Sequence, residues 1–314
     1  MNNSFITIVG LVSSNSDLLK KYIVNVYKTL NDNFTDFEII LVNNKSKIDI
    51  KKISQELKQE VRKEVFVLNL AKAVDPNNAI VAGLDRANGD FTIVFDIEFF
   101  DKSKLIVDLY NKAKDNFDIV FLKYKHRDLP RFTRILYKFV YFLINRYSNI
   151  RMDMNIHTNS IISRRALNSI IKVREKLRNM KVIYSSVGYN TSSIEVDIDK
   201  PLSNNSLSDQ FKSAILILTT FTNLIHIILI RIFIISILFC IGVSIDALMT
   251  KYFGIGIFGT PSQYIPGWTF LVVMASVMFS FLTLILYIFS FYLANINNEI
   301  KERPLYFIES IQRL

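Results

Sequence analysis

The strongest constraint on this chain is an apolar segment that is long enough to cross a membrane. Of the 314 residues, none between Tyr252 and Asn298 is charged. A helix over residues 268–294 would be roughly 40 Å long at ~1.5 Å per residue. The hydrocarbon layer of a bilayer is ~30 Å thick, so such a helix crosses it with some tilt. A domain that precedes this segment would therefore be held at a membrane surface, where lipids are within reach.

A second apolar segment precedes the first and predicts a hairpin of two transmembrane helices. Residues 221–249 contain Arg231 near their start and Asp246 near their end. Arg231 can extend its long side chain to the membrane surface. The loop over residues 250–267 carries a single charge, on Lys251. Basic residues thus lie outside the two spans, and the positive-inside rule predicts that both termini lie in the cytoplasm.

These segments predict the order of the domains. We expect a soluble domain over residues 1–200, a linker and juxtamembrane helix over 201–222, two transmembrane helices within 223–295, and a cytoplasmic tail over 296–314. The expected location is the cytoplasmic (inner) membrane, with the soluble domain on the cytoplasmic side.

The soluble part of the chain is basic. Up to Lys212 it has 33 basic and 24 acidic residues, which accounts for +9 of the formal net charge of +10. Such a surface attracts anionic lipid head groups and phosphorylated ligands. No segment clusters Lys and Arg with aromatic residues as a nucleic-acid platform would, so no nucleic-acid partner is expected. Cys240 is the one cysteine, so no disulfide forms within the chain.

The first 200 residues alternate between strand and helix patterns. Strands are expected over residues 5–12, 37–42, 65–70, 91–95, 118–122 and 191–196, and helices over 17–30, 48–61, 77–87, 102–114 and 163–171. This alternation predicts an α/β fold with a mostly parallel sheet covered on both faces. In such sheets ligands bind at the carboxyl ends of the strands.

Two carboxylates follow the expected strand at 91–95. Asp96 and Glu98 are two positions apart, and side chains at that spacing on a strand point to the same side. Together they could hold one divalent ion, and the ion could bridge the diphosphate of a nucleotide. The alternative is an acidic cluster at the start of the next helix, because Asp101 and Lys102 follow.

Asn43 and Asn44 follow the expected strand at 37–42. Their amides could hydrogen-bond a base or a ribose. Asn is equally an ordinary turn residue, so a purely structural role is the alternative.

Residues 130–147 predict a helix with a broad apolar stripe and several basic residues. It could be a core helix with a solvated basic face, or an interfacial helix in the head-group layer. The apolar segments downstream favour the second interpretation. The basic run that leads into this helix would suit a lipid phosphate, which Arg binds through paired donors. The candidate phosphate-binding residues are Lys123, Arg127, Arg131 and Arg134.

Several motifs together resemble the family 2 glycosyltransferases of the polyprenyl-phosphate type, which include dolichyl-phosphate mannosyltransferases and bactoprenol glucosyltransferases. The resemblance covers nearly the whole chain. It is carried by AGLDRANGD ahead of Asp96-Ile97-Glu98, by ISRR at the end of residues 145–165, and by PGWTF and NNEIKERPLY towards the C-terminus.

This resemblance implies a GT-A catalytic domain, which is Rossmann-like, together with a nucleotide-sugar donor, Mg²⁺ or Mn²⁺, and a polyprenyl-phosphate acceptor. Asp96 and Glu98 would be the catalytic metal ligands, and Asn43, Asn44 and Asp96 would contact the donor. The acceptor phosphate would attack the anomeric carbon, with inversion, as the nucleoside diphosphate leaves. A phosphate oxygen is already nucleophilic at neutral pH, so the larger need is to neutralise the leaving diphosphate. The lipid bilayer is a further expected partner, and a homo-oligomer is compatible with the sequence.

The chain departs from the family pattern in its donor motifs. Asn43-Asn44-Lys45-Ser46 stands where Asp-Asp-Gly-Ser is usual, Glu98 replaces the second Asp of Asp-x-Asp, and Thr158 stands at a usual Asp. Two alternatives to the expected enzyme therefore stay open. One is a weak or inactive relative that acts as a membrane partner of other glycan-assembly proteins. The other transfers sugar to a different lipid or glycan.

Overall fold

The computed structural model describes residues 2–12, 15–125, 156–172, 187–197 and 304–314, together with single positions elsewhere. Contacts divide the chain into two units. The first comprises Met1–Ile217 and Arg303–Leu314, and the second comprises Leu218–Glu302. The expected linker at 201–222 lies outside the described residues, and so does most of the expected interfacial helix at 130–147.

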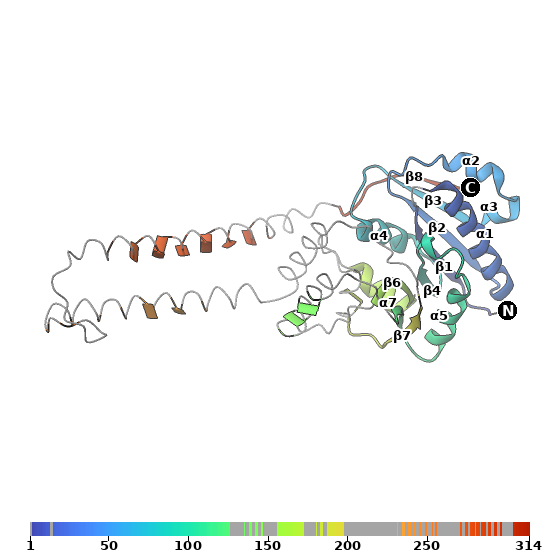
Figure 1. Ribbon diagram of the computed structural model, residues 1–314. Coiled ribbons are helices and arrows are strands. Elements are labelled where there is room, and N and C mark those ends of the chain that lie inside the picture. Colours follow the sequence, from blue (N-terminus) through green and yellow to red (C-terminus); the bar gives the residue numbers. More distant parts are fainter. Residues whose placement is uncertain are drawn as a thin grey trace. The chain divides into compact units, whose positions relative to one another are not determined.

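The described strands of the first unit form one sheet in the order β7-β5-β6-β4-β1-β2-β3-β8 (Figure 1). β1 pairs in parallel with β2 and β4, β2 with β3, and β5 with β7. Two strands run the other way: β6 between β4 and β5, and β8 beside β3. The bounds are β1 Ile6–Leu11, β2 Phe37–Asn43, β3 Val65–Leu70, β4 Phe91–Val94, β5 Ile119–Tyr124, β6 Ile156–Ser163, β7 Thr191–Val196 and β8 Ile308–Arg313. The predicted α/β fold with a mostly parallel sheet is confirmed.

Helices cover both faces of this sheet. Successive residues of β2 show why: Ile39 and Leu41 pack into one apolar cluster with α1, α2, α3 and α5, while Ile40 and Val42 pack into a second cluster with α4 and α7. Because both faces are buried, the central strands are apolar without interruption. The helix bounds are α1 Ser16–Asn33, α2 Ile50–Glu56, α3 Gln59–Lys63, α4 Pro76–Arg86, α5 Lys104–Lys114 and α7 Arg164–Lys172.

The single helix predicted over residues 48–61 is wrong, because the chain forms two short helices there. Lys58 adopts an extended backbone between α2 and α3. Ile53, Leu57 and Val61 are all buried and keep a four-residue spacing across the break. The apolar periodicity therefore continues through the interruption and does not reveal it.

Strand β6 was not predicted, although it is the partner of both β4 and β5. Its sequence, IHTNSIIS, places polar residues in the interior of the sheet. His157, Asn159 and Ser160 are all buried. A run with so many polar residues resembles a loop, which is why the pattern failed to predict a strand here.

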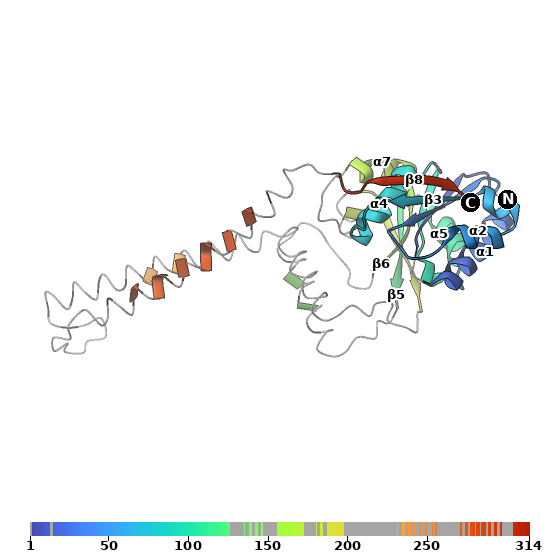
Figure 2. The same ribbon diagram turned by 90° about the horizontal axis from the view of Figure 1, so that it is seen from above.

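The C-terminal residues form part of the first unit's sheet, whereas the sequence predicted a cytoplasmic tail over 296–314. β8 lies antiparallel along β3, and Figure 2 shows it running beside that strand. The pairing is extended at both ends, because the Ala71 N–H donates to the Phe307 carbonyl at 2.8 Å and the Leu314 N–H donates to the Val65 carbonyl at 3.0 Å. The chain therefore returns to the first unit after residues 218–302.

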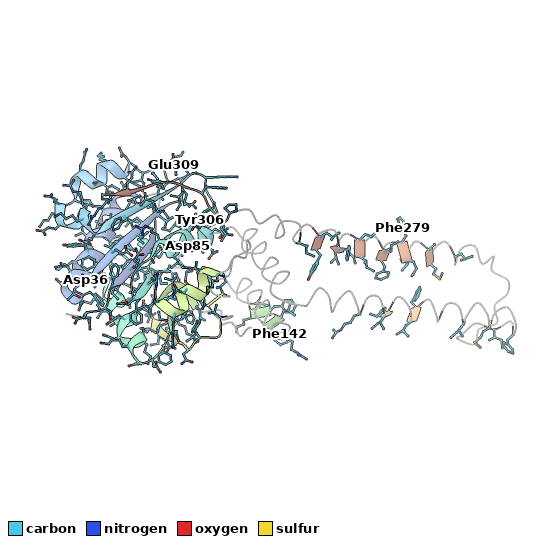
Figure 3. All side chains as sticks on the ribbon, turned by 180° about the vertical axis from the view of Figure 1, so that it is seen from behind. Asp36, Asp85, Phe142, Phe279, Tyr306 and Glu309 are labelled. Atoms are coloured by element: carbon cyan, nitrogen blue, oxygen red, sulfur yellow. The ribbon has the colours of Figure 1, made fainter. Side chains whose placement is uncertain are left out.

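The second unit is described only at single positions. Its described helical residues between 231 and 296 expose large apolar side chains; Phe279, for example, is 66% exposed (Figure 3). Within the described part of the chain, no helix is long and apolar enough to span a membrane. Most of residues 223–295, where two spans were predicted, lie outside the described residues.

Helix α4 packs unusually close to the sheet at Gly83. A Cβ atom on Gly83 would lie 2.4 Å from Val9 Cγ1 and 2.9 Å from Val42 Cγ2. Both neighbours are β-branched residues in central strands, so neither side chain can move aside easily. Gly83 therefore sets how closely α4 approaches β1 and β2.

Replacing Gly83 by Ala should lower the free energy of unfolding by about 1 kcal/mol. The gain in helix propensity is ~1 kcal/mol, but overpacking of a filled core costs roughly 1–3 kcal/mol. Thermal unfolding of the two proteins measures the difference. Arg86→Ala is the matched control, since Arg86 is exposed on the same helix. A Gly83→Ala variant as stable as this control would contradict the proposed close packing.

Candidate active site

The candidate site lies where the carboxyl ends of β1, β2 and β4 meet. Parallel pairing brings these three ends to the same edge of the sheet. At the end of β4, the Phe95 N–H donates to the Val9 carbonyl at 3.0 Å. The buried Tyr22 hydroxyl donates to the Phe95 carbonyl at 2.9 Å. The Asp96 N–H then donates to Asn159 Oδ1 at 2.9 Å, so β1, α1 and β6 together fix the backbone that leads into Asp96.

Asp96 and Glu98 do not continue strand β4, contrary to the geometry that the sequence suggested. Residues Ile97–Phe99 form a short 3₁₀ helix, η1, and Asp96 caps it by accepting a hydrogen bond from the Glu98 N–H at 3.1 Å. Ile97 and Phe99 are buried and anchor the turn, whereas Asp96 and Glu98 are exposed. The two carboxylates are thus presented to solvent by a capped turn and not by strand alternation.

Both carboxyl groups have a raised pKa, and loss of hydration is the larger cause for each. Partial burial raises the pKa of Asp96, although two backbone N–H groups oppose the rise. Partial burial also raises the pKa of Glu98, and the charge of Asp96 raises it further. The Asp96 side chain keeps contact with solvent but has protein on most sides, so its loss of hydration is real but incomplete. A divalent cation here would favour both ionised forms.

These residues fit a divalent metal in part. No group of three or more His, Cys, Asp or Glu side chains suited to a metal occurs among the described residues. Mg²⁺ is commonly held in proteins by one or two carboxylates together with substrate phosphates and water. Asp96 and Glu98 match that arrangement, and they remain the predicted ligands.

Asn43 and Asn44 use their amides inside the protein. Asn43 Nδ2 donates to Asn69 Oδ1 at 2.8 Å, and Asn43 Oδ1 accepts from the backbone and hydroxyl of Ser46, both at 2.9 Å. Asn44 makes a reciprocal pair with the Val74 backbone, donating at 2.8 Å and accepting at 2.9 Å. Both side chains therefore shape the loops that border the site. Their predicted contact with the donor stays a prediction.

The predicted phosphate-binding residues are only partly described. Lys123 lies near the carboxyl end of β5, which runs in the same direction as β4. Arg127, Arg131 and Arg134 lie outside the described residues. Their role as an acceptor-phosphate site stays a prediction.

Sequence reasoning missed the contribution of β6 to the site. Asn159 is fully buried and holds the Asp96 backbone. His157 packs against the rings of Phe99 and Tyr124, with centroids 5.0 and 5.3 Å away, and its Nδ1 accepts from the Asn159 N–H at 3.0 Å. The positions of a buried His and Asn could have been found only if the polar run had been read as a strand.

The Ser-Arg-Arg motif, Ser163–Arg165, lies at the other end of the strands from the candidate site, because Ser163 pairs with Phe91 at the start of β4. The Ser163 hydroxyl and the Arg165 guanidinium both donate to Asp118, and the Arg164 guanidinium donates to the Ala87 carbonyl at 2.6 Å. Arg165 holds the pKa of the buried Asp118 carboxyl below its usual range. This motif joins β5, β6 and α4, so its role here is structural.

A comparison with known protein families decides the assignment. Residues 9–171, more than half of the chain, match the sequence profile of glycosyl transferase family 2. The chain belongs to this family. Its GT-A-like α/β fold and its assignment as a glycosyltransferase, both expected from the sequence, are confirmed.

Named relatives of this glycosyltransferase include proteins of similar length. An uncharacterized glycosyltransferase of Synechocystis sp. is 26% identical over 98% of this chain and 95% of its own. A prophage bactoprenol glucosyl transferase homolog of Escherichia coli is 30% identical over 51% of this chain and 52% of its own. Among solved structures, glucosyl-3-phosphoglycerate synthase from Mycobacterium tuberculosis, in complex with Mn²⁺, uridine diphosphate and phosphoglyceric acid, is 14% identical. It aligns with a TM-score of 0.47 over 69% of this chain and 77% of its own.

Neutralising either carboxyl group of the glycosyltransferase should raise its melting temperature at neutral pH in EDTA. The raised pKa values mean that the folded state binds protons more tightly than the unfolded state, so wild-type stability falls as pH rises through them. Asp96→Asn and Glu98→Gln remove this cost. Their advantage should vanish in acid, where the wild-type groups are protonated.

Thermal unfolding between about pH 4 and pH 8 measures this difference. Asp101→Asn is the control, because Asp101 is an exposed acid just after η1. An advantage that persists unchanged into acid would show that charge is not its cause.

Proposed function

We propose that this glycosyltransferase moves a sugar from a nucleotide-sugar to a polyprenyl phosphate at the cytoplasmic face of a membrane. The observation that carries the proposal is the capped turn at the end of β4, which presents Asp96 and Glu98 together at the sheet edge where α/β enzymes bind ligands. Relatives named bactoprenol glucosyl transferase, and one named undecaprenyl-phosphate 4-deoxy-4-formamido-L-arabinose transferase, support this acceptor class.

In this proposal the chain's own residues bind and orient the donor. Asp96 and Glu98 would hold Mg²⁺ or Mn²⁺, which when bound neutralises charge on the departing nucleoside diphosphate. Asn159 and Tyr22 fix the backbone beneath Asp96, so the carboxylate needs little reorganisation when the donor binds. The acceptor phosphate oxygen forms the new bond to the anomeric carbon while the bond to the diphosphate breaks on the opposite face, so the configuration inverts.

The acceptor would approach from the membrane. Near the basic run at 123–134, Ile135, Phe139 and Phe142 are described as helical and are exposed; Phe142 is 62% exposed (Figure 3). This exposure disfavours the core-helix interpretation for these side chains. Large apolar side chains with nearby Lys138 and Arg146 suit a helix in the head-group layer.

Two observations support a membrane location for residues 218–302: their apolar composition, and the pairing of the following residues with the sheet of the first unit. Most of the described large apolar side chains of this unit are exposed, and a large exposed apolar surface marks contact with lipid or protein. Residues 303–314 belong to the same unit as the catalytic domain. Any membrane crossings between them must therefore be even in number, and two fit the lengths of the apolar segments.

A second candidate function is a weak or inactive partner of other glycan-assembly proteins. The altered turn at residues 43–46 favours it, because Asn43 and Asn44 make internal hydrogen bonds where the family usually has two acids. The two candidates differ in whether purified protein transfers sugar.

The test is transfer of radiolabelled sugar from a panel of nucleotide-sugars to undecaprenyl phosphate in detergent with Mg²⁺ or Mn²⁺. The wild type should transfer at least one sugar. Asp96→Asn should reduce the rate by a hundredfold or more, which corresponds to about 2.7 kcal/mol of lost transition-state stabilisation. EDTA should have the same effect. Absence of transfer from every donor would favour the inactive partner.

Topology is tested by cysteine labelling in intact cells after Cys240 has been replaced. A cysteine at Ser262, between the two predicted spans, should react with an impermeant thiol reagent. A cysteine at Leu314 should react only after the cells are opened, because β8 belongs to the sheet of the domain that the proposal places in the cytoplasm. Equal labelling of both sites in intact cells would refute two crossings with cytoplasmic termini.

A further inference from the structure

We propose that the C-terminal strand β8 holds the turn at residues 43–46 in place and that Ser310 is a positioning residue for nucleotide-sugar binding. The inference rests on the proposed function, because it takes the carboxyl ends of β1, β2 and β4 as the donor site. It concerns side chains on β8, which no sequence motif marked as functional.

A chain of hydrogen bonds links β8 to the turn through β3. Asn69 Nδ2 donates to the Ser310 hydroxyl at 3.0 Å, and Asn69 Oδ1 accepts from Asn43 Nδ2 at 2.8 Å. Asn43 Oδ1 in turn accepts from the Ser46 N–H and hydroxyl. All four side chains are half-buried, and Asn69 and Ser310 lie opposite each other in the β3–β8 ladder.

The direction of these bonds is fixed at one end. The Ser46 backbone N–H can only donate, so Asn43 must present its oxygen to the turn and its NH₂ group to Asn69. Asn69 must then present its own oxygen to Asn43, which leaves its NH₂ group for Ser310. Removing the Ser310 hydroxyl leaves that NH₂ group without its partner on β8, so Asn69, and through it Asn43 and the turn, is held less tightly.

A second contact joins the same two parts of the chain. Lys45 has a φ of 58°, in the left-handed region that non-glycine residues seldom adopt. Its ammonium lies 2.5 Å from a carboxylate oxygen of Glu309, the residue before Ser310. This ion pair is exposed and contributes little by itself. The turn therefore contacts Glu309 directly and is linked to the adjacent Ser310 through Asn69. The half-buried series of hydrogen-bonded amides is the stronger of the two links.

Strand β8 is anchored independently of Ser310. Its backbone pairs with β3, and the Tyr306 hydroxyl donates to Asp85 on α4 (Figure 3). Leu314 packs against one apolar cluster of the domain, and Leu305 and Tyr306 pack against the other. Loss of the Ser310 hydroxyl should therefore release the turn without detaching the strand.

The experiment compares Ser310→Val with Ser310→Thr, which have nearly the same shape and differ in the hydroxyl. Binding of UDP, GDP and ADP, each with Mg²⁺, is measured by calorimetry on the full-length protein in detergent. Ser310→Thr should bind the preferred nucleotide like the wild type. Ser310→Val should bind it about fivefold more weakly, the factor expected for one hydrogen bond. The KM for the nucleotide-sugar should rise similarly, while the KM for undecaprenyl phosphate stays unchanged.

Two further variants separate positioning from general destabilisation. Gln312→Val changes an exposed residue of the same strand and should leave nucleotide binding unchanged. Asn69→Leu removes the middle member of the hydrogen-bond series. Adding Ser310→Val to this variant should therefore weaken nucleotide binding no further.

Equal affinity of the Val and Thr variants, or additive losses in the double variant, would overturn the inference while leaving the proposed function intact. Failure of the wild type to bind any of the three nucleotides would overturn the proposed function and the inference with it.

Discussion

The parallel pairing of β1 with both β2 and β4 is the interaction on which the rest of the catalytic domain depends. It brings three carboxyl ends to one edge and so creates the place where the candidate site forms. β1 also contributes side chains to both apolar clusters, because Ile6 and Ile8 pack with α1 and α5 while Val9 packs with α4. A substitution that disturbs β1 would therefore affect the packing of the core and the geometry of the candidate site at the same time.

The backbone that leads into Asp96 is held by groups other than the two candidate metal ligands. Gly10 lacks a side chain where a Cβ atom would lie 2.8 Å from the Tyr22 hydroxyl, and this space lets Tyr22 reach the Phe95 carbonyl. Burial raises the pKa of Tyr22, so its hydroxyl stays protonated and remains a donor. Asn159 adds a support from the other side. The Asp96 carboxylate is exposed, but the backbone that carries it is held rigidly.

The sequence predicted the strands that are buried on both faces, since an uninterrupted apolar run such as that of β2 admits few other interpretations. It did not predict β6, whose interior includes His157 and Asn159, or β8, whose pairing depends on a strand far away in the chain. For the site, the sequence indicated Asp96 and Glu98 but gave the wrong geometry, because strand alternation stops at the capped turn. It indicated Asn43 but not its partner Asn69, because a side-chain hydrogen bond between neighbouring strands produces no periodic pattern in the sequence.

The separation of β8 from β3 has a consequence for biosynthesis. Asn69 and Ser310 are 241 positions apart, and the whole apolar unit of residues 218–302 is translated between them. The N-terminal part of a protein usually begins to fold during synthesis, so β3 would at first present an unpaired edge, which is a known route to aggregation. A nascent chain would complete its sheet only after the apolar segments had left the ribosome.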